Sequence, residues 1–330
     1  MTQDRRPMPP PLKMPKPGFG RRTPPAIFPP IMGLFGLGLG WRAAAPAFEV
    51  SPGVGDAILG AVALLFSFAL VAWLAKPLRR PGVVLEELRV LPGRAGLAAA
   101  SLCMMLLAAS LAPFTPALAR ALAVLAFSVH IGLVVVLIHV LRSGPPEGRV
   151  VTPVFHLTFV GFILGGVAAN ALGEPEIARI ILWSMLIPAG VIWGISARQI
   201  ISRPPPAPLR PLLAIHLAPA SLFAVVAHGA GMVAPSHAFA ALAAAIFAGL
   251  LVSVRWLTSA GFSPLWGAFT FPMAAFATAL ILISEGHGAM GWIGGFVLAF
   301  ATLFIPYIAY RILKLWAGGT LAAKTNAAEA

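Results

Sequence analysis

The chain has 330 residues, of which 59% are apolar and only 10% carry a charge. A soluble domain carries about 25% charged residues, and here they fall in short clusters between long apolar runs, which is typical of a multi-span helical membrane protein. The net charge of +13 does not indicate a nucleic-acid-binding protein, because the basic residues lie at the ends of the apolar runs, where membrane topology accounts for them. A single cysteine, Cys103, excludes an internal disulfide or a cysteine-based metal site.

The N-terminal stretch is basic and rich in proline, and it lacks the apolar core and small-residue cleavage site of a secretory signal. We predict that residues 1–25 form a disordered cytoplasmic tail whose Lys and Arg side chains lie against anionic membrane lipids. Residues 26–316 form the predicted transmembrane domain, and residues 317–330 a second disordered cytoplasmic tail.

A helix needs about 20 apolar residues to cross the hydrocarbon core of a bilayer. Ten apolar runs approach or exceed this length, although the third is short and rich in alanine. They predict an all-α integral membrane protein with ten transmembrane helices. The predicted helices cover residues 27–45, 56–75, 95–112, 117–141, 151–172, 177–197, 212–234, 237–257, 264–283 and 291–310.

The basic residues predict the orientation of these helices. If both termini lie on one side, that side holds 20 of the 23 Lys and Arg residues, and the other side holds Arg42, Arg120 and Arg179. Positively charged loops stay in the cytoplasm, so both termini are predicted to be cytoplasmic, in the inner membrane of the cell. The connectors on the opposite side are short, at residues 113–116, 173–176, 235–236 and 285–291.

The odd-numbered runs share a pattern of prolines. Each begins near a proline, and runs seven and nine carry a further one inside, at Pro219 and Pro272. This repetition indicates five helical hairpins. Since proline removes a backbone donor and bends a helix, Pro30, Pro219 and Pro272 are predicted to kink their helices.

The apolar runs contain almost no chemistry of the usual catalytic kinds. No Asp or Glu lies deep in any run, which argues against a proton-relay pump and leaves no carboxylate cage for a cation. No phosphate-binding glycine loop and no nucleophile–base set is present, so we expect neither an enzyme nor a bound cofactor or metal. The glycines of "GLFGLGLG" (33–40) are predicted to serve close helix packing.

Small and hydroxyl side chains recur on the odd-numbered runs. Such residues permit close packing of helices, and they also suit the wall of a narrow, weakly polar conduit. A conduit without fixed acids favours anions, which need only hydrogen-bond donors and the partial positive charge of helix ends. The candidate lining residues are Gly33, Gly36, Ser101, Thr158, Ser221, Thr270 and Thr278.

Histidines supply an alternative of a different class. His130 lies on the fourth run, His156 on the fifth, and His216 and His228 on the seventh. Two facing histidines can hold a haem, which would make the protein a membrane b-type haem protein. The competing interpretation is that these side chains hydrogen-bond between helices.

Three stretches resemble a known family. They are "PPIMGLFGLGLGW" (29–41), "HLAPASL" (216–222) and, as the most specific of the three, "AFTFPMAAFATA" (268–279). With the ten-run layout and its short outer loops, they make residues 24–316 similar to the tellurite-resistance/dicarboxylate transporter family, which includes TehA-like bacterial proteins and the plant slow-type anion channels.

The resemblance implies a fold and a gate. Five helical hairpins would surround a central pore, with odd-numbered helices lining it, in a homotrimer whose subunits each have a pore. A phenylalanine on the ninth helix occludes the pore in the family, in a motif like "FTFP" here, which points to Phe271 and, as second choice, Phe269. Family substrates are small inorganic or organic anions, including chloride, nitrate, malate, sulfite and tellurite.

The chain departs from the family where helices three and five would carry internal prolines. Residues near Leu102 and at Thr158 stand in those places, so we expect these two helices to be less kinked. The function predicted from the whole sequence is a passive anion channel or uniporter. A proton-coupled C4-dicarboxylate or sulfite exporter is the alternative within transport. The alternative interpretation of Phe271 and Pro272 is a structural kink with no gating role.

Overall fold

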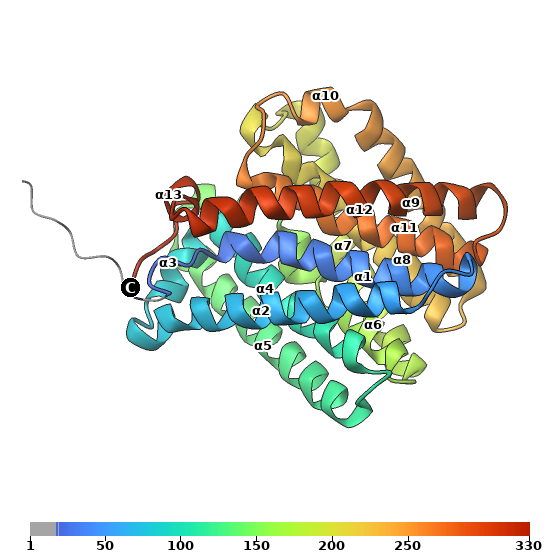
Figure 1. Cartoon of the computed structure of the whole chain (residues 1–330). Coiled ribbons are helices and arrows are strands. Elements are labelled where there is room, and N and C mark those ends of the chain that lie inside the picture. The colour runs from blue at the N-terminus through green and yellow to red at the C-terminus, as the bar shows by residue number, and fades with distance from the viewer. Residues whose placement is uncertain (1–17, 19) are drawn as a thin grey trace, which may run out of the picture.

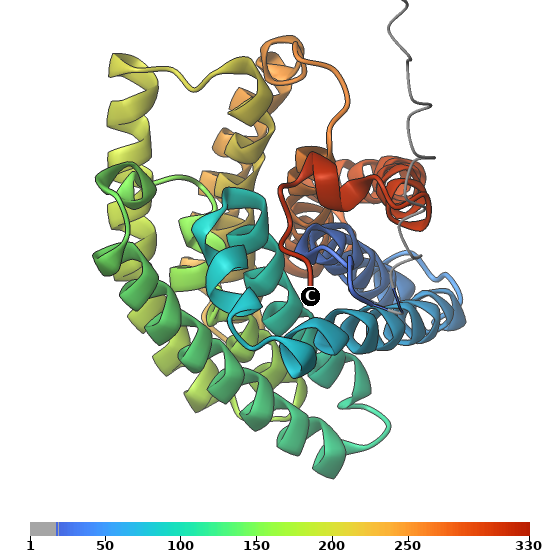
Figure 2. The same ribbon diagram turned by 90° about the vertical axis from the view of Figure 1, so that its left-hand side faces the viewer.

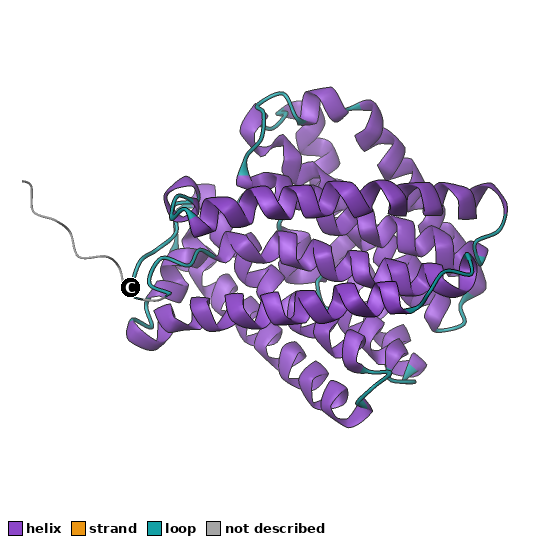
Figure 3. Ribbon diagram, in the orientation of Figure 1, coloured by secondary structure: helices purple, strands orange, loops and turns teal. Residues whose placement is uncertain are grey.

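The structure is a computed structural model that describes residue 18 and residues 20–330. Within that part of the chain every regular element is helical (Figure 3). The longer elements are α1 (Phe28–Ala47), α2 (Gly53–Arg79), α4 (Leu91–Leu111), α5 (Pro116–Ser143), α6 (Ile163–Ala171), α7 (Pro175–Ser202), α8 (Leu217–Gly229), α9 (Val233–Val252), α11 (Thr270–Ser284) and α12 (Gly288–Ala317). Short helices α3 (Val83–Arg89), α10 (Val254–Leu257) and α13 (Leu321–Lys324) lie in connectors and near the C-terminus.

Eight helical segments in the described chain are long and apolar enough to cross a membrane. They are α2, α4, α5, α7, the segment Ala207–Gly229 that ends in α8, α9, the segment Pro264–Ser284 that ends in α11, and α12. The two other predicted spans correspond to α1 and to the shorter apolar segment His156–Ala171. The all-helical, multi-span character predicted from hydropathy is therefore confirmed.

The helices form two layers, an inner closed ring and an outer set that packs on it. α1 packs against α4, α4 against α6, α6 against α8, α8 against α11, and α11 against α1. On the outside α2 packs on α1, α5 on α4, α7 on α6, α9 on α8 and α12 on α11. Figures 1 and 2 show this arrangement of helices in two views at right angles.

Burial separates the two layers sharply. In the 18-residue apolar stretch of each helix, 83% of the residues are buried in α4 and in the segment ending in α8, whereas 17% are buried in α5 and in α9. A helix that is apolar all round and yet exposed within its own chain is typical of a lipid-facing helix. The outer layer therefore presents an apolar surface suited to hydrocarbon, and the inner ring is shielded from it.

Three inner elements change helix type at a proline. α1, α8 and α11 are each preceded by a 3₁₀ segment, at Pro25–Ile27, Ala207–His216 and Pro264–Phe269. Pro30, Pro219 and Pro272 each occupy the third residue of the α-helix that follows. The first four N–H groups of an α-helix lack an intrahelical acceptor, so proline costs no α-helical bond there. These prolines lie in the first turn of an α-helix, two residues after a change of helix type, and their role as kinks stays a prediction.

The two helices without internal prolines behave differently from one another. α4 is continuous from Leu91 to Leu111, as expected. The fifth predicted span, in contrast, is broken: a π-helical turn at His156–Val160 and a turn at Gly161 and Phe162 precede α6. The expectation of a less kinked fifth helix is therefore wrong, because a π turn interrupts the regular bonding pattern without any proline.

The outer layer satisfies carbonyl groups at two of these breaks. His130 on α5 lies 2.9 Å through Nε2 from the carbonyl oxygen of Thr158, in the π turn. Because that oxygen only accepts, Nε2 carries the proton, and Nδ1 then accepts from the hydroxyl of Ser101, 2.7 Å away. Trp193 on α7 donates through Nε1 to the carbonyl of His216, where α8 begins, at 3.2 Å. An unpaired carbonyl is costly in hydrocarbon, so the His130 contact stabilises the π turn. Trp193 gives the His216 carbonyl a second donor, beside its bond within α8.

The C-terminal residues fold against the start of the chain. Residues 317–330 were predicted to be a disordered tail, but α13 buries Leu321 and Ala322, and Thr325 is also buried. Glu329 forms an ion pair with Arg22 at 3.0 Å, and the amide of Ala330 donates to the carbonyl of Arg21. Apolar burial and these polar contacts order the tail, and both described ends of the chain meet on one side of the molecule (Figure 1). Residues 1–17 and 19 of the predicted N-terminal tail lie outside the described residues.

A fully buried ion pair lies beneath that C-terminal segment. Lys76, near the end of α2, contacts Glu87 of α3, and both side chains have no exposed surface. Nζ of Lys76 also donates to the carbonyl of Thr23 at 3.1 Å. Burial raises the pKa of the Glu87 carboxyl, and the hydrogen bond and charge of Lys76 oppose that shift. The pair joins α2, α3 and the segment that leads into α1.

Replacing His130 with leucine is expected to destabilise the protein by about 1–3 kcal/mol, the cost of a buried carbonyl without a donor. The measurement is the thermal unfolding midpoint of detergent-purified protein. His139→Leu, an exposed position on the same helix, serves as the control and should leave the midpoint near that of the parent. Equal midpoints for the two variants would contradict the assigned role of His130.

Removing one member of the Lys76–Glu87 pair is expected to cost about 3–5 kcal/mol, because it leaves the other charge buried and unpaired. Glu87→Leu and Lys76→Met should therefore each lower the unfolding midpoint strongly. The double variant should recover much of the loss, since two apolar side chains can pack where the pair was. Additive losses in the double variant would show that the two charges do not act as a unit.

Candidate functional site

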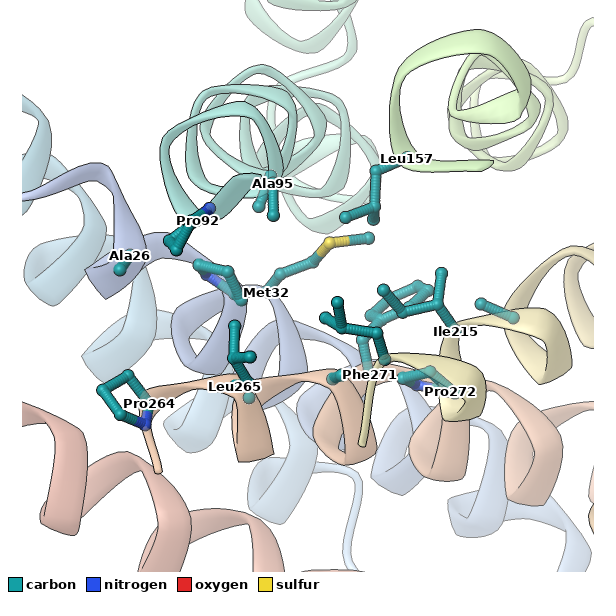
Figure 4. A pocket seen from close by; sticks show the side chains of 16 residues that line it. Ala26, Met32, Pro92, Ala95, Leu157, Ile215, Pro264, Leu265, Phe271 and Pro272 are labelled. Atoms are coloured by element: carbon teal, nitrogen blue, oxygen red, sulfur yellow. The ribbon is translucent and has the colours of Figure 1, made fainter. Parts of the chain in front are cut away.

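Three cavities follow one another through the interior of the inner ring. The inner cavity, of about 50 Å³, opens near the prolines at the starts of the inner elements, and Figure 4 shows side chains from all five elements converging on it. A central cavity of about 20 Å³ lies beside the π turn, and an outer cavity of about 280 Å³ extends toward the other end. None of the residues that line these three cavities belongs to α2, α5, α7, α9 or α12.

Phe271 is the one described residue that lines all three cavities. Its side chain is 5% exposed, so the ring fills the space where the cavities meet. Figure 4 shows it beside Pro272 and Ile215, with Met32 and Leu157 reaching across from α1 and the π turn. The ring therefore separates an inner space from an outer one.

Glycines of α1 make room for this part of α11. A Cβ atom on Gly36 would lie 3.0 Å from Cδ2 of Phe271, and one on Gly33 would collide with the side chain of Thr270. The close packing predicted for "GLFGLGLG" is thus present, and its contact with α11 fixes the depth at which the Phe271 ring lies.

Phe269 takes no part in these cavities. It is half-buried, its ring lies 5.7 Å from that of Trp266 in an edge-on arrangement, and it is absent from all three linings. Of the two phenylalanines predicted as gate residues, the structure brings only Phe271 to the place where the cavities meet.

The cavity walls follow narrow stripes with helical spacing. On α4 the lining residues recur every three or four positions, and the same spacing holds on α1, as expected for one face of a helix. The stripe on α4 consists of Pro92, Ala95, Ala99, Leu102 and Leu106, and that on α1 of Pro29, Met32, Gly36, Leu39, Arg42 and Ala43.

Only two of the seven predicted lining residues line any of the three cavities. Gly36 and Thr278 line the outer cavity. The other five are buried in contacts between or within helices: Ser101 bonds to His130, Thr158 supplies the carbonyl to the same histidine, Ser221 donates to Leu217, Thr270 donates to Gly267, and Gly33 packs against Thr270. Each of the four hydroxyl residues is the immediate sequence neighbour of a lining residue and points off the stripe.

Three of the four candidate histidines are hydrogen-bonded, although Nδ1 of His156 and Nε2 of His216 are buried without a partner among the described residues. His156 and His216 are joined by a hydrogen bond of 2.9 Å between Nε2 and Nδ1. A haem iron with one imidazole on each face needs roughly 4 Å between the two ligating nitrogens, at about 2 Å per bond, so this pair has the geometry of a hydrogen bond and not of a haem site. His130 already engages Ser101 and Thr158, while His228 is half-buried near the end of α8. Within the described residues no group of three or more His, Cys, Asp or Glu is placed to hold a metal ion.

Two residues of the walls were missed in the sequence. Met32 lines both the inner and the central cavity, and Arg42 is the one charged side chain among the residues that line the three cavities. A signal was present, since Pro29, Met32, Gly36, Leu39 and Arg42 follow one another at intervals of three or four. The predicted lining residues were small or hydroxyl side chains, and of this series they include only Gly36.

Besides Arg42, the polar side chains on these walls are those of His156 in the central cavity and Thr278 in the outer cavity, and no carboxylate contributes to them. The α-helices α8 and α11 begin inside the ring at Leu217 and Thr270, where each continues a 3₁₀ segment whose carbonyl groups accept from the first amide of the α-helix. Positive charge on the cavity walls therefore comes from Arg42.

A comparison with family models agrees with this geometry. The model described as SLAC1, voltage-dependent anion channel, matches residues 22–313. No curated protein matches the chain. The match covers both layers of helices and all three cavities, and it confirms the family predicted from the three sequence stretches. The chain belongs to the SLAC1 family of voltage-dependent anion channels.

Proposed function

We propose that the protein is a passive channel or uniporter for small anions, with its conduit inside the ring of α1, α4, α6, α8 and α11. The observation that carries the proposal is that Phe271 forms a wall of all three cavities. An anion that passes from the inner to the outer cavity has to pass this ring. Phe271 is therefore the gate, and Pro272 begins the regular turn of α11 that holds it in place.

The membrane arrangement is part of the same proposal. All ten predicted spans cross the membrane, α1 and the His156–Ala171 segment included, as five hairpins whose first helices line the pore. The contact of Ala330 with Arg21 supports an even number of crossings, because it brings both described ends to one side. The basic residues of that side support an inner-membrane protein with cytoplasmic termini. We also propose that the protein forms the homotrimer that the resemblance implies.

Selection for anions follows from the charges around the conduit. An anion is stabilised by Arg42, while the walls present no carboxylate to attract a cation. Basic residues on the cytoplasmic side raise the local concentration of anions there. These terms favour negative charge without a tight binding site.

Gating in this proposal is the displacement of one aromatic ring. A constriction lined by apolar side chains excludes water and so blocks a hydrated ion. Phe271 is held between Gly36 of α1 and the residues of α8, such as Leu222 and Ala218, that share its cavities. A change in its side-chain rotamer would join the inner and outer cavities without unfolding α11.

Replacing Phe271 with alanine is expected to raise anion conductance by at least tenfold, because it removes the apolar constriction between the cavities. The measurement is current through protein reconstituted in planar bilayers. Phe269→Ala is the matched control, since it removes the same ring two residues away and outside the cavity linings. Equal currents in the parent and in a correctly folded Phe271→Ala variant would contradict the gate.

Liposome flux separates the channel from the alternative of a proton-coupled exporter of C4-dicarboxylates or sulfite. We expect efflux of small anions, tested with chloride, nitrate, sulfite and malate, to be driven by their own gradients and unaffected by an imposed pH gradient. Coupling commonly uses membrane carboxylates, and the cavity walls have none. Flux that required a proton gradient would favour the exporter, and no flux of any anion would contradict the central proposal.

A further inference from the structure

The outer cavity contains one fixed charge at a defined depth. Arg42 lies on the wall of this cavity, whose other lining residues are apolar or glycine, apart from the hydroxyl of Thr278. That hydroxyl already donates to the carbonyl of Ala274. Arg42 is six residues beyond Gly36, which contacts the Phe271 ring, so its Cα lies about 9 Å farther along α1.

The guanidinium is anchored from behind. Its Nε donates to Oδ1 of Asp56 at 2.6 Å, and Nη1 donates to the carbonyl of Ser110 at 2.8 Å. Its charge also lies 5.3 Å from the centre of the Phe114 ring. None of these three partners lines the outer cavity, so the acceptors hold the guanidinium in one orientation without occupying the cavity.

Part of the guanidinium is left for a ligand. Among the described residues, Nη2 of Arg42 donates to no protein acceptor, whereas Nε and Nη1 are both engaged. The side chain is 19% exposed, so a charge there is only partly screened and interacts more strongly than at the surface. A free N–H group in a preorganised, partly buried guanidinium is a good donor for an anion.

Close packing of α2 on α1 creates the arrangement. A Cβ atom on Gly55 would lie 2.8 Å from the amide nitrogen of Arg42 and 2.9 Å from its Cγ. Only glycine permits this approach, and the next residue, Asp56, is thereby brought alongside the guanidinium. The orientation of Arg42 is therefore set by the packing of the two helices.

We propose that Arg42 is an anion-binding and selectivity residue of the outer cavity, where Nη2 binds a small monovalent anion before or after it passes Phe271. The charge class follows from Asp56, which pairs with the guanidinium. A monovalent ion gains a hydrogen-bonded position at Nη2 and adds one negative charge beside the carboxylate, whereas a dianion adds two and is repelled more strongly. This inference rests on the proposed channel function and adds the position and charge of the ion to it.

The test measures unitary chloride conductance in the Phe271→Ala background, where the constriction is open. In about 10 mM chloride, at a Debye length of about 30 Å, Arg42→Gln should lower conductance by about threefold or more. The difference should vanish in about 1 M chloride, where the Debye length is about 3 Å. Arg42→Lys, which keeps the charge, should retain most of the conductance. Equal conductance of Arg42→Gln and its parent at low salt would overturn the proposal.

Two further variants separate the guanidinium from net charge. Arg42→Gln/Asp56→Asn has the same net charge as the parent, and it should lose conductance as well, because the donor is gone. Asp56→Asn alone should raise the permeability of sulfate relative to chloride, because the guanidinium is no longer neutralised. Arg120→Gln, an exposed outer cation paired with Glu174, is the control and should change neither quantity. Loss of conductance in Arg42→Gln with full recovery in the double variant would show that only net charge matters and would overturn the proposal.

A second measurement keeps this inference separate from the channel function. If the Phe271→Ala parent carries no current, the channel proposal fails, and the anion site is then tested directly with bromide. Crystals of the parent soaked in bromide should show an anomalous peak beside Nη2 of Arg42, and crystals of Arg42→Gln should not. Absence of that peak in the parent would overturn the site, whatever the result for current.

Discussion

The structure depends on one constraint, which is that every backbone carbonyl in an apolar interior needs a donor. The inner ring would meet this constraint easily if its elements were continuous helices, but several of them change helix type inside the ring. At the π turn the donor is His130, which comes from the outer layer. Trp193, also from the outer layer, adds a second donor to the carbonyl at the start of α8. The outer helices therefore do more than face lipid, since they contribute donors to inner helices that change type inside the ring.

For the proposed conduit, preference for an anion rests on two features of the walls. No carboxylate lines the three cavities, and Arg42, paired with Asp56, lies closer to the outer end. The remaining barrier is then concentrated at Phe271, whose position depends on the glycines of α1. In the proposed channel, charge sets which ions enter and a single apolar ring sets when they pass.

Much of the fold could be predicted from the sequence, because hydropathy and charge act over whole segments. The apolar runs, the prolines near the inner helices and the Lys and Arg asymmetry are all long-range patterns that tolerate local error. The site was predicted less well, since it depends on single positions. Ser101, Thr158, Ser221 and Thr270 were selected for their polarity, but each is one residue off the stripe that lines the cavities, where a rotation of about 100° per residue turns it toward another helix. Arg42 and Met32, which are on the stripe, were not predicted, because Met32 is apolar and Arg42 was assigned from its charge to the outer end of a helix. The break at His156–Val160 could not be predicted, because no proline marks it and its stabilising donor, His130, comes from another helix.

The stripes have a consequence for how such a chain can diverge. Each inner helix shows one narrow face to the cavities and its remaining faces to other helices, while the outer helices show lipid an apolar surface with few specific demands. Changes on the narrow faces alter the conduit and leave the packing between layers intact, and changes on the lipid side alter neither. In the proposed channel, substrate range and membrane fit are therefore encoded at separate positions, and selection can act on one without disturbing the other.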